Sequence, residues 1–275
     1  MTTSELSADY PPLRGLLFDF DGTLVDSELE LHLPAFNQAF SDTALPWRWG
    51  IPLYTRLLEV PGGRERIRAY ADQHCPQMSV AQRDTLAGQV HAAKNIRVQQ
   101  RLTERPLRLR PGIAGLLGEA GRAGLRLGIA STASFSTIES AMNGALGRSV
   151  WEVFDTIIGS DQVARGKPQP DVYLRALTEL GLSTVETIAI EDSQVGLAAA
   201  RAAGLVTVVA HNALTCDQNF EGAALVLESL GPPGNAAPPS TPAQPRESST
   251  LDLEHLAALL RQGVSPAPAS GFPTT

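Results

Sequence analysis

The stretch LLFDFDGTLVDSE at residues 16–28 decides the fold of this chain and most of its chemistry. An apolar run of buried-strand length ends in two carboxylates one residue apart, and Gly22 and Thr23 then break the strand pattern. Because residues i and i+2 of a strand share a face, Asp19 and Asp21 should project together beyond the strand end. Two ionised carboxylates at this spacing repel each other unless a cation lies between them. An all-oxygen site suits Mg²⁺, so the pair predicts a metal.

Four later apolar runs also have strand character, at residues 125–130, 156–158, 187–190 and 206–210. Helical patterns lie between them, at about 112–123, 135–146, 170–180 and 194–203. Strands that alternate with helices indicate a parallel sheet covered on both faces. The expected fold class is therefore α/β, with a Rossmann-like parallel sheet core and a ligand site beyond the carboxyl ends of the strands.

Residues 27–105 differ from the rest of the chain, because they are polar, rich in Arg, Gln and Ala, and show helical spacing without a convincing strand. This block sits between the first strand and the remainder of the sheet, which predicts an inserted helical cap. Pro106 and the Pro-Gly pair at 111–112 disfavour further helix and mark the return to the core. The core then consists of residues 1–26 and 106–230.

The C-terminal part changes composition at Gly231. Residues 231–250 are dense in Pro, Ala, Ser and Thr, which predicts a flexible linker that is dispensable for catalysis. Residues 251–260 have the apolar spacing of a short amphipathic helix, and residues 264–275 are expected to be disordered. Residues 251–275 are thus expected to form a short helix followed by a tail.

Composition limits the partners and the compartment. The chain has 275 residues and a formal net charge of −7, which argues against a nucleic-acid or anionic-membrane partner. No apolar run approaches a membrane span and the first residues lack the features of a signal peptide, so a cytoplasmic protein is expected. The isolated Cys75 and Cys216 form neither a disulfide framework nor a metal cluster. Oligomeric state stays open, with a monomer slightly favoured.

Three further motifs lie where the sheet pattern places strand ends. Ser131 and Thr132 precede a helix, where hydroxyls and free backbone N–H groups form either a phosphate cradle or only an N-cap. Lys167 lies in the Pro-flanked stretch RGKPQPD, although a lone loop lysine is more often a solvated charge. Glu191 and Asp192 end the strand at 187–190. They either cap the following helix or add metal ligands at the edge that carries the first acidic pair.

The order of these four motifs resembles the haloacid dehalogenase superfamily of hydrolases. The patterns that carry the resemblance are D-x-D-G-T-L at 19–24, the hydroxyl cluster at 131–134, G-K-P-x-P-D at 166–171 and E-D-S-x-x-G-x-x-A-A at 191–200. The second Asp of the first motif is typical of the phosphotransferase branch. The resemblance covers residues 13–230.

The resemblance implies a role for each core residue. Asp19 is expected to attack phosphorus and form an aspartyl phosphate, and Asp21 to act as general acid and then general base. Ser131 and Lys167, with Thr132 beside them, are expected to hold the phosphoryl oxygens. The implied Mg²⁺ ligands are Asp19, the backbone carbonyl of Asp21, Asp192 and, in support, Glu191.

Cap sequence is similar to that of the CbbY-type phosphatases, which hydrolyse xylulose-1,5-bisphosphate, a rubisco inhibitor. The similar patterns are W-x-W at 47–49, Y-x-x-L-L at 54–58 and G-G-R-E-R-I at 62–67. The implied substrate-binding residues are Glu28, His32, Tyr54, Gly62, Gly63, Arg64, Lys94 and Thr132, with His91 nearby.

Two features of the cap depart from that family. Arg64 stands in place of a lysine, which keeps the charge but changes how a phosphate is bound. The stretch from Glu28 to His32 is one residue longer than the family spacing. A bisphosphate needs a second anion site, and we expect Arg64, after the exposed backbone of Gly62 and Gly63, to bind the phosphate that is not transferred. The alternative is that the cap arginines at 48, 56, 64, 66 and 68 only solvate helix faces.

The sequence therefore predicts a Mg²⁺-dependent sugar-phosphate phosphatase, most simply one that acts on xylulose-1,5-bisphosphate. A β-phosphoglucomutase-like mutase would share the core and the helical cap but return the phosphoryl group to sugar. A non-catalytic binding protein on the same fold is a third possibility, which the intact acidic, hydroxyl and lysine motifs disfavour.

Overall fold

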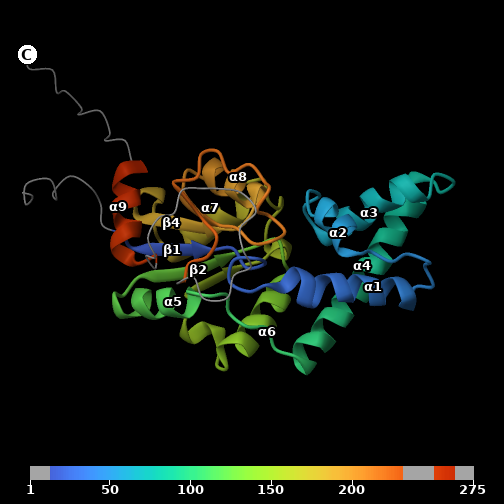
Figure 1. Cartoon of the computed structure of the whole chain (residues 1–275), viewed down its shortest axis with the longest axis horizontal. Coiled ribbons are helices and arrows are strands. Elements are labelled where there is room, and N and C mark those ends of the chain that lie inside the picture. Colours follow the sequence, from blue (N-terminus) through green and yellow to red (C-terminus); the bar gives the residue numbers. More distant parts are fainter. Residues whose placement is uncertain (1–12, 232–250, 264–275) are drawn as a thin grey trace, which may run out of the picture.

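The computed structural model describes residues 13–231 and 251–263. Its centre is a parallel six-stranded sheet in the order β3-β2-β1-β4-β5-β6 (Figure 1). The strands are β1 (Gly15–Phe18), β2 (Arg126–Ala130), β3 (Thr156–Ile158), β4 (Thr187–Glu191), β5 (Val206–Ala210) and β6 (Leu225–Leu227). The α/β class and five of the strands are as predicted. The sixth, a three-residue strand at the edge of the sheet that is only partly buried, was missed.

Helices cover both faces of the sheet. One face packs against α5 (Ile113–Arg122), α6 (Phe135–Leu146) and α9 (Leu253–Gly263), and the other against α7 (Asp171–Leu180) and α8 (Gln194–Ala202) (Figure 1). Side chains of β1 alternate between the two clusters, with Leu16 and Phe18 in one and Leu17 in the other. Short 3-10 turns lie in the connections, at Val150–Glu152, Ser160–Gln162 and Thr184–Glu186.

In the block between β1 and the rest of the sheet, every regular element over residues 28–104 is a helix. It contains a π-helical turn, η1 (Glu28–His32), followed by α1 (Leu33–Asp42), α2 (Ile51–Leu57), α3 (Gly63–His74) and α4 (Val80–Glu104). A separate aromatic cluster holds these helices together, with Phe36, Phe40 and Trp49 at its centre. Figure 1 shows this cap standing beside the core, with α4 reaching back to α6.

Helix α9 belongs to the core. Leu256 and Leu260 are almost fully buried in the cluster that also contains residues of β4, β5 and α5. The sequence predicted this helix but gave no docking site for it. The predicted linker at 232–250 and the predicted tail at 264–275 lie outside the described residues.

Leu256→Ala should lower the free energy of unfolding by about 2–5 kcal/mol, because a buried leucine leaves a cavity when it is truncated. Glu254→Ala is the matched control, since Glu254 lies on the exposed side of the same helix and should change stability by about 0.5 kcal/mol or less. Urea unfolding followed by circular dichroism measures both. Equal, small changes would show that α9 does not dock on the sheet in solution.

Within residues 13–231 and 251–263, the structure contains no helix that combines the length and the hydrophobicity required to cross a membrane. Cys75 is buried, Cys216 is exposed, and both are free thiols.

Candidate active site

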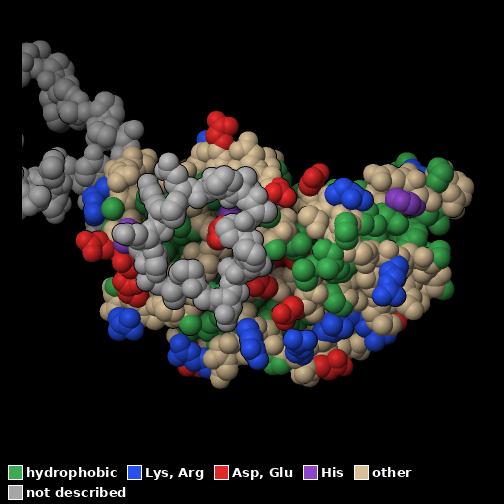
Figure 2. Space-filling model, in the orientation of Figure 1, with side chains coloured by type: hydrophobic (Ala, Val, Ile, Leu, Met, Phe, Trp, Pro, Cys, Tyr) green, Lys and Arg blue, Asp and Glu red, His purple; other side chains and the backbone are tan. Residues whose placement is uncertain are grey.

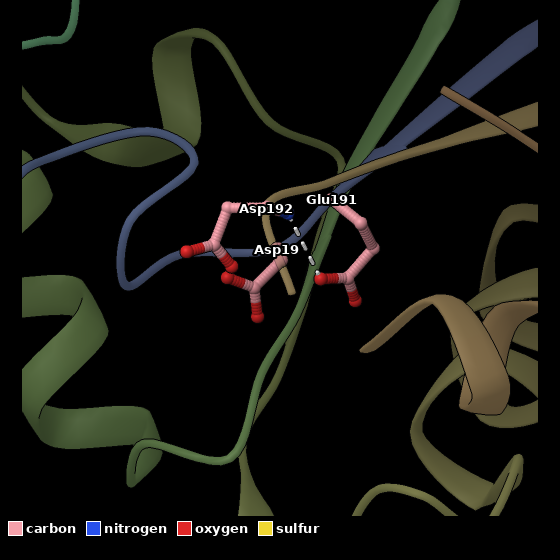
Figure 3. Close-up of side chains that lie close together, drawn as sticks. All are labelled: Asp19, Glu191 and Asp192. Carbon is pink, nitrogen blue, oxygen red and sulfur yellow. Dashed lines mark hydrogen bonds between the residues drawn. The ribbon is translucent and has the colours of Figure 1, made fainter. Parts of the chain in front are cut away.

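The acidic residues of the first and fourth motifs meet at the carboxyl edge of the sheet. Asp19 directly follows β1, Glu191 is the last residue of β4, and these two strands are neighbours in the sheet. Each of Asp19, Glu191 and Asp192 offers one oxygen within 4.8 Å of the others. In Figure 3 the carboxylates of Asp19 and Asp192 lie side by side, with Glu191 on the other side of Asp19. The predicted meeting of the two motifs is therefore observed.

Lys167 reaches this cluster from the loop before α7. Its Nζ donates to Asp19 Oδ1 at 2.7 Å and to Glu191 Oε1 at 2.6 Å. Burial alone would lower the pKa of the ammonium, but the two carboxylates outweigh burial and raise it. Lys167 is thus a permanent cation inside the site and not a solvated surface charge.

Glu191 has two neighbours that the sequence analysis did not single out. The Tyr173 hydroxyl donates to Glu191 Oε1, and the Tyr173 ring centroid lies 4.9 Å from Lys167 Nζ. A Cβ at Gly196 would come within 1.9 Å of Glu191 Oε2, so only glycine fits there. Tyr173 has the spacing of a core-facing helix residue, which concealed its role. It fixes Glu191, and through Glu191 it fixes Lys167.

Asp192 is oriented by a residue that lies beyond the end of a third strand, β5. The Asn212 side-chain amide, two residues beyond β5, donates to Asp192 Oδ2 at 2.7 Å. Asn212 also lines the cleft described below. Its position just past a strand end is the signal by which the sheet pattern could have revealed it.

Asp21 has partners of its own, separate from the acidic cluster. The Ser27 hydroxyl donates to Asp21 Oδ1, and His32 Nε2 lies 2.9 Å from the same oxygen. Burial favours the neutral acid, but His32 and Ser27 outweigh burial and lower the pKa of Asp21. The extra residue between Glu28 and His32 falls in the π-helical turn, which takes more residues per turn than an α-helix. His32 consequently still reaches Asp21.

The donor set fits a divalent cation. Asp19, Glu191 and Asp192 are buried carboxylates, and Lys167 is the ammonium that bonds to them. Burial and mutual repulsion raise the pKa of Asp19 to about 7 and that of Asp192 well above its usual range. A cation with two positive charges would balance the excess and keep both carboxylates ionised. Since every donor is an oxygen, Mg²⁺ suits the site.

A cleft with two connected compartments lies between the core and the cap. The first, of about 660 Å³ including its mouth, is lined by Asp19, Lys167 and Asp192. The second, of about 570 Å³, is lined by His91 and Lys94 from α4. Both compartments share the residues Asp21, Glu28, Gly62, Arg66 and Thr132. The arrangement suits an elongated ligand with one end at the acidic cluster and the other under the cap.

Most of the predicted substrate-binding residues border this cleft. Glu28, His32, Gly62, Gly63, Lys94 and Thr132 all line it. Tyr54 lies behind them, fully buried, and its hydroxyl donates to Glu28. Figure 2 shows hydrophobic side chains gathered over α2 and the adjoining part of α1, and Leu58 and Pro61, which follow α2, line the first compartment.

Two predicted residues are not among those that line the cleft. Arg64 is exposed and is not among the residues that line the cleft, although it was expected to bind a second phosphate. Ser131 is fully buried, and its Oγ accepts a hydrogen bond from the Ala133 amide. Ser131 directly follows β2, at the same edge of the sheet as Asp19, and its neighbour Thr132 lines the cleft.

For Arg66, the alternative that the cap arginines only solvate helix faces is wrong. Its side chain is buried, donates to the Leu57 carbonyl at 3.0 Å and to the Tyr54 hydroxyl at 3.2 Å, and lines both compartments. Lys94 is also buried, with Nζ 5.3 Å from the centroid of the Phe36 ring, and burial lowers its pKa to about 8. These two cations are positioned to meet an anion under the cap.

Comparison with known proteins supports an enzyme of one particular family. Residues 13–204 match the model of haloacid dehalogenase-like hydrolases. The chain is 44% identical over 232 residues to the plasmid-encoded protein CbbY of Cupriavidus necator, covering 84% of this chain and 91% of that protein.

Among solved structures, CbbY from Rhodobacter sphaeroides in complex with xylulose-(1,5)bisphosphate superposes with a TM-score of 0.70 at 37% identity, covering 79% of this chain and 94% of that one. A β-phosphoglucomutase from Clostridium difficile shares the fold at 22% identity and a TM-score of 0.61, covering 79% of this chain and 91% of that one.

Proposed function

The chain belongs to the haloacid dehalogenase-like hydrolases and is a phosphatase of the CbbY type that acts on sugar phosphates, and we propose that its substrate is xylulose-1,5-bisphosphate. The observation that carries the proposal is the two-compartment cleft. One compartment has the acidic cluster and Lys167, and the other has the buried cations Lys94 and Arg66. A sugar with a phosphate at each end matches this distribution of charge.

The reaction would proceed in two steps. Asp19 attacks phosphorus and forms an aspartyl phosphate while Asp21, in the protonated form that its lowered pKa makes the minor one, gives a proton to the departing sugar oxygen. Asp21 then takes a proton from the water that hydrolyses the intermediate, which releases phosphate and restores Asp19. Ser131 and Lys167, with Thr132 beside them in the cleft, would hold the oxygens of the transferred group.

A cation would complete the site. Mg²⁺ would be held by the side chains of Asp19 and Asp192 and by the backbone carbonyl of Asp21. Glu191 would support these ligands, because it accepts hydrogen bonds from Lys167 and from the Asp192 backbone N–H. When bound, Mg²⁺ supplies positive charge that offsets the repulsion between the nucleophile and the phosphate.

Phosphate release in the presence of Mg²⁺, measured across sugar monophosphates and bisphosphates, tests the proposal. We expect the highest kcat/KM on xylulose-1,5-bisphosphate. The same assays with glucose phosphates, with and without glucose bisphosphate as activator, test for mutase activity. Isomerisation of a hexose phosphate faster than phosphate release would contradict the hydrolase assignment.

Lys94→Met should raise the activation free energy that corresponds to kcat/KM on xylulose-1,5-bisphosphate by about 1.5–3 kcal/mol. The reason is that a charged hydrogen bond to the remote phosphate is lost. Turnover of p-nitrophenyl phosphate, which has no second phosphate, should hardly change. Steady-state kinetics on both substrates measure the difference.

Arg64→Ala is the control for this experiment, since Arg64 is a cationic cap residue outside the cleft. It should leave kcat/KM on both substrates nearly unchanged. A selective loss at Arg64 and none at Lys94 would restore the assignment made from the sequence. Equal losses on the two substrates in Lys94→Met would indicate damage to the cap and not a lost phosphate contact.

A further inference from the structure

Arg110 lies buried next to the acidic cluster without lining the cleft. It belongs to the segment that leads from the cap back to the core. Its guanidinium donates to the Gly22 carbonyl through Nη1, to the Ala210 carbonyl through Nη1 at 2.9 Å and to the His211 carbonyl through Nη2 at 2.9 Å. Its Nε lies 3.2 Å from Asp26 Oδ1. A single side chain thus binds the segment after β1 and the segment after β5.

Each of the two segments carries or adjoins a residue of the candidate active site. Gly22 follows Asp21, and the loop after β5 carries Asn212, whose amide binds Asp192. The segments also touch directly, because a Cβ at Gly22 would come within 2.1 Å of Asp192 Oδ2 and within 2.7 Å of Asn212 Nδ2. The ends of β1, β4 and β5 are therefore packed together, and Arg110 joins two of them.

Arg110 also helps to fix the backbone around Gly22. The Gly22 N–H donates to the Val25 carbonyl at 2.8 Å, and the Gly22 carbonyl accepts from Arg110. Because a trans peptide is planar, the Asp21 carbonyl must point opposite to the Gly22 N–H, away from Val25. The Gly22–Thr23 peptide, whose carbonyl Arg110 binds, is the next one along the chain, so hydrogen bonds hold both peptides that flank the Gly22 Cα.

The same residue closes the base of the cap. Arg110 N donates to the Leu24 carbonyl at 2.9 Å, and Leu109 pairs with Val25 in an antiparallel bridge. The two connections between core and cap are therefore held together at the point where the guanidinium enters the core. In the sequence, the Pro-Gly pair that follows Arg110 marks only the return from the cap to the core.

We propose that Arg110 is a positioning residue that holds the Gly22 carbonyl and the loop of Asn212 in place, so that the site is formed before a divalent cation binds. The inference rests on the proposed function in one respect, namely that the acidic cluster binds such a cation. Partners that orient metal ligands typically change metal affinity by about 10–100-fold when they are replaced.

Binding of Mn²⁺, followed by electron paramagnetic resonance on the full chain, tests this role without relying on turnover. Arg110→Gln should weaken Mn²⁺ binding by about tenfold or more. The Mg²⁺ concentration for half-maximal hydrolysis of p-nitrophenyl phosphate should rise in parallel. Arg110→Lys keeps the charge but lacks the planar guanidinium that reaches several carbonyls. Its loss of Mn²⁺ affinity should therefore be smaller than that of Arg110→Gln. If Arg110→Gln does not fold, Arg110→Lys decides by the same criterion, weaker Mn²⁺ binding than in wild type.

Arg83→Gln is the matched control. Arg83 donates to the carbonyls of Cys75 and Met78 and lies beside Asp72 in the cap, outside the cleft. Its replacement should cost stability and leave Mn²⁺ affinity unchanged. Wild-type Mn²⁺ affinity in the folded Arg110 variants would overturn the positioning role. Absence of Mn²⁺ binding by the wild type would overturn the proposed metal site and this role with it.

Discussion

Asp19→Asn should reduce turnover by about 10⁴-fold or more on every phosphate ester tested. The amide is not a nucleophile toward phosphorus, and it removes a negative charge from the proposed metal site. The prediction includes p-nitrophenyl phosphate, since no leaving group can compensate for a missing nucleophile. Single-turnover assays with excess enzyme should show neither fast product release nor a phosphorylated protein. Mass spectrometry of the protein must first exclude deamidation back to Asp.

The fold of Asp19→Asn should remain intact. Burial raises the pKa of Asp19 to about 7, so the ionised side chain is disfavoured in its own site, and a neutral amide of equal size is tolerated there. Lys167 keeps its bond to Glu191. Thermal unfolding should therefore change little. A rate above a small fraction of wild type, in protein free of deamidation, would remove Asp19 from the nucleophile role.

The acidic edge could be predicted from the sequence because a parallel sheet brings its strand ends together. Once Asp19 and Glu191 were each placed at a strand end, the topology brought them to one edge. Tyr173, Arg110 and the Asn212 contact could not be predicted in the same way. Their partners are backbone carbonyls and carboxylates far away in the chain, which no local periodicity reveals.

In the cap, the position of a residue on its helix adds information that the family pattern lacks. Arg64 and Arg66 are two residues apart in α3, so they point to different sides of the helix. The buried residues of α3 also include Ile67 and Tyr70, and Tyr70 is one helical turn beyond Arg66. This spacing places Arg66, and not Arg64, on the packed face. The expectation for Arg64 followed the family pattern and stays a prediction, whereas helix geometry alone identifies the buried Arg66.

Asp21→Ala should lower kcat on a sugar phosphate by about 10²–10⁴-fold, the usual size of a lost general acid or base. Binding of Mn²⁺ should persist, because the proposed metal contact of Asp21 is its backbone carbonyl. The structure separates Asp21 from the metal cluster, since its side chain is held by Ser27 and His32. Metal titration of the variant by electron paramagnetic resonance, together with steady-state kinetics, measures both expectations.

A substrate whose leaving group needs no proton distinguishes the role of Asp21 as general acid from its role as general base. p-Nitrophenolate departs as a stable anion and needs no proton, so Asp21→Ala should still phosphorylate Asp19 with this substrate. The later hydrolysis still lacks its base. Rapid mixing should therefore show a burst of nitrophenol close to one equivalent of enzyme, followed by slow turnover, and the aspartyl phosphate should accumulate. No such burst can occur in Asp19→Asn. Lost Mn²⁺ binding with unchanged chemistry in Asp21→Ala would instead make its side chain a metal ligand, and the proton would have to come from another group.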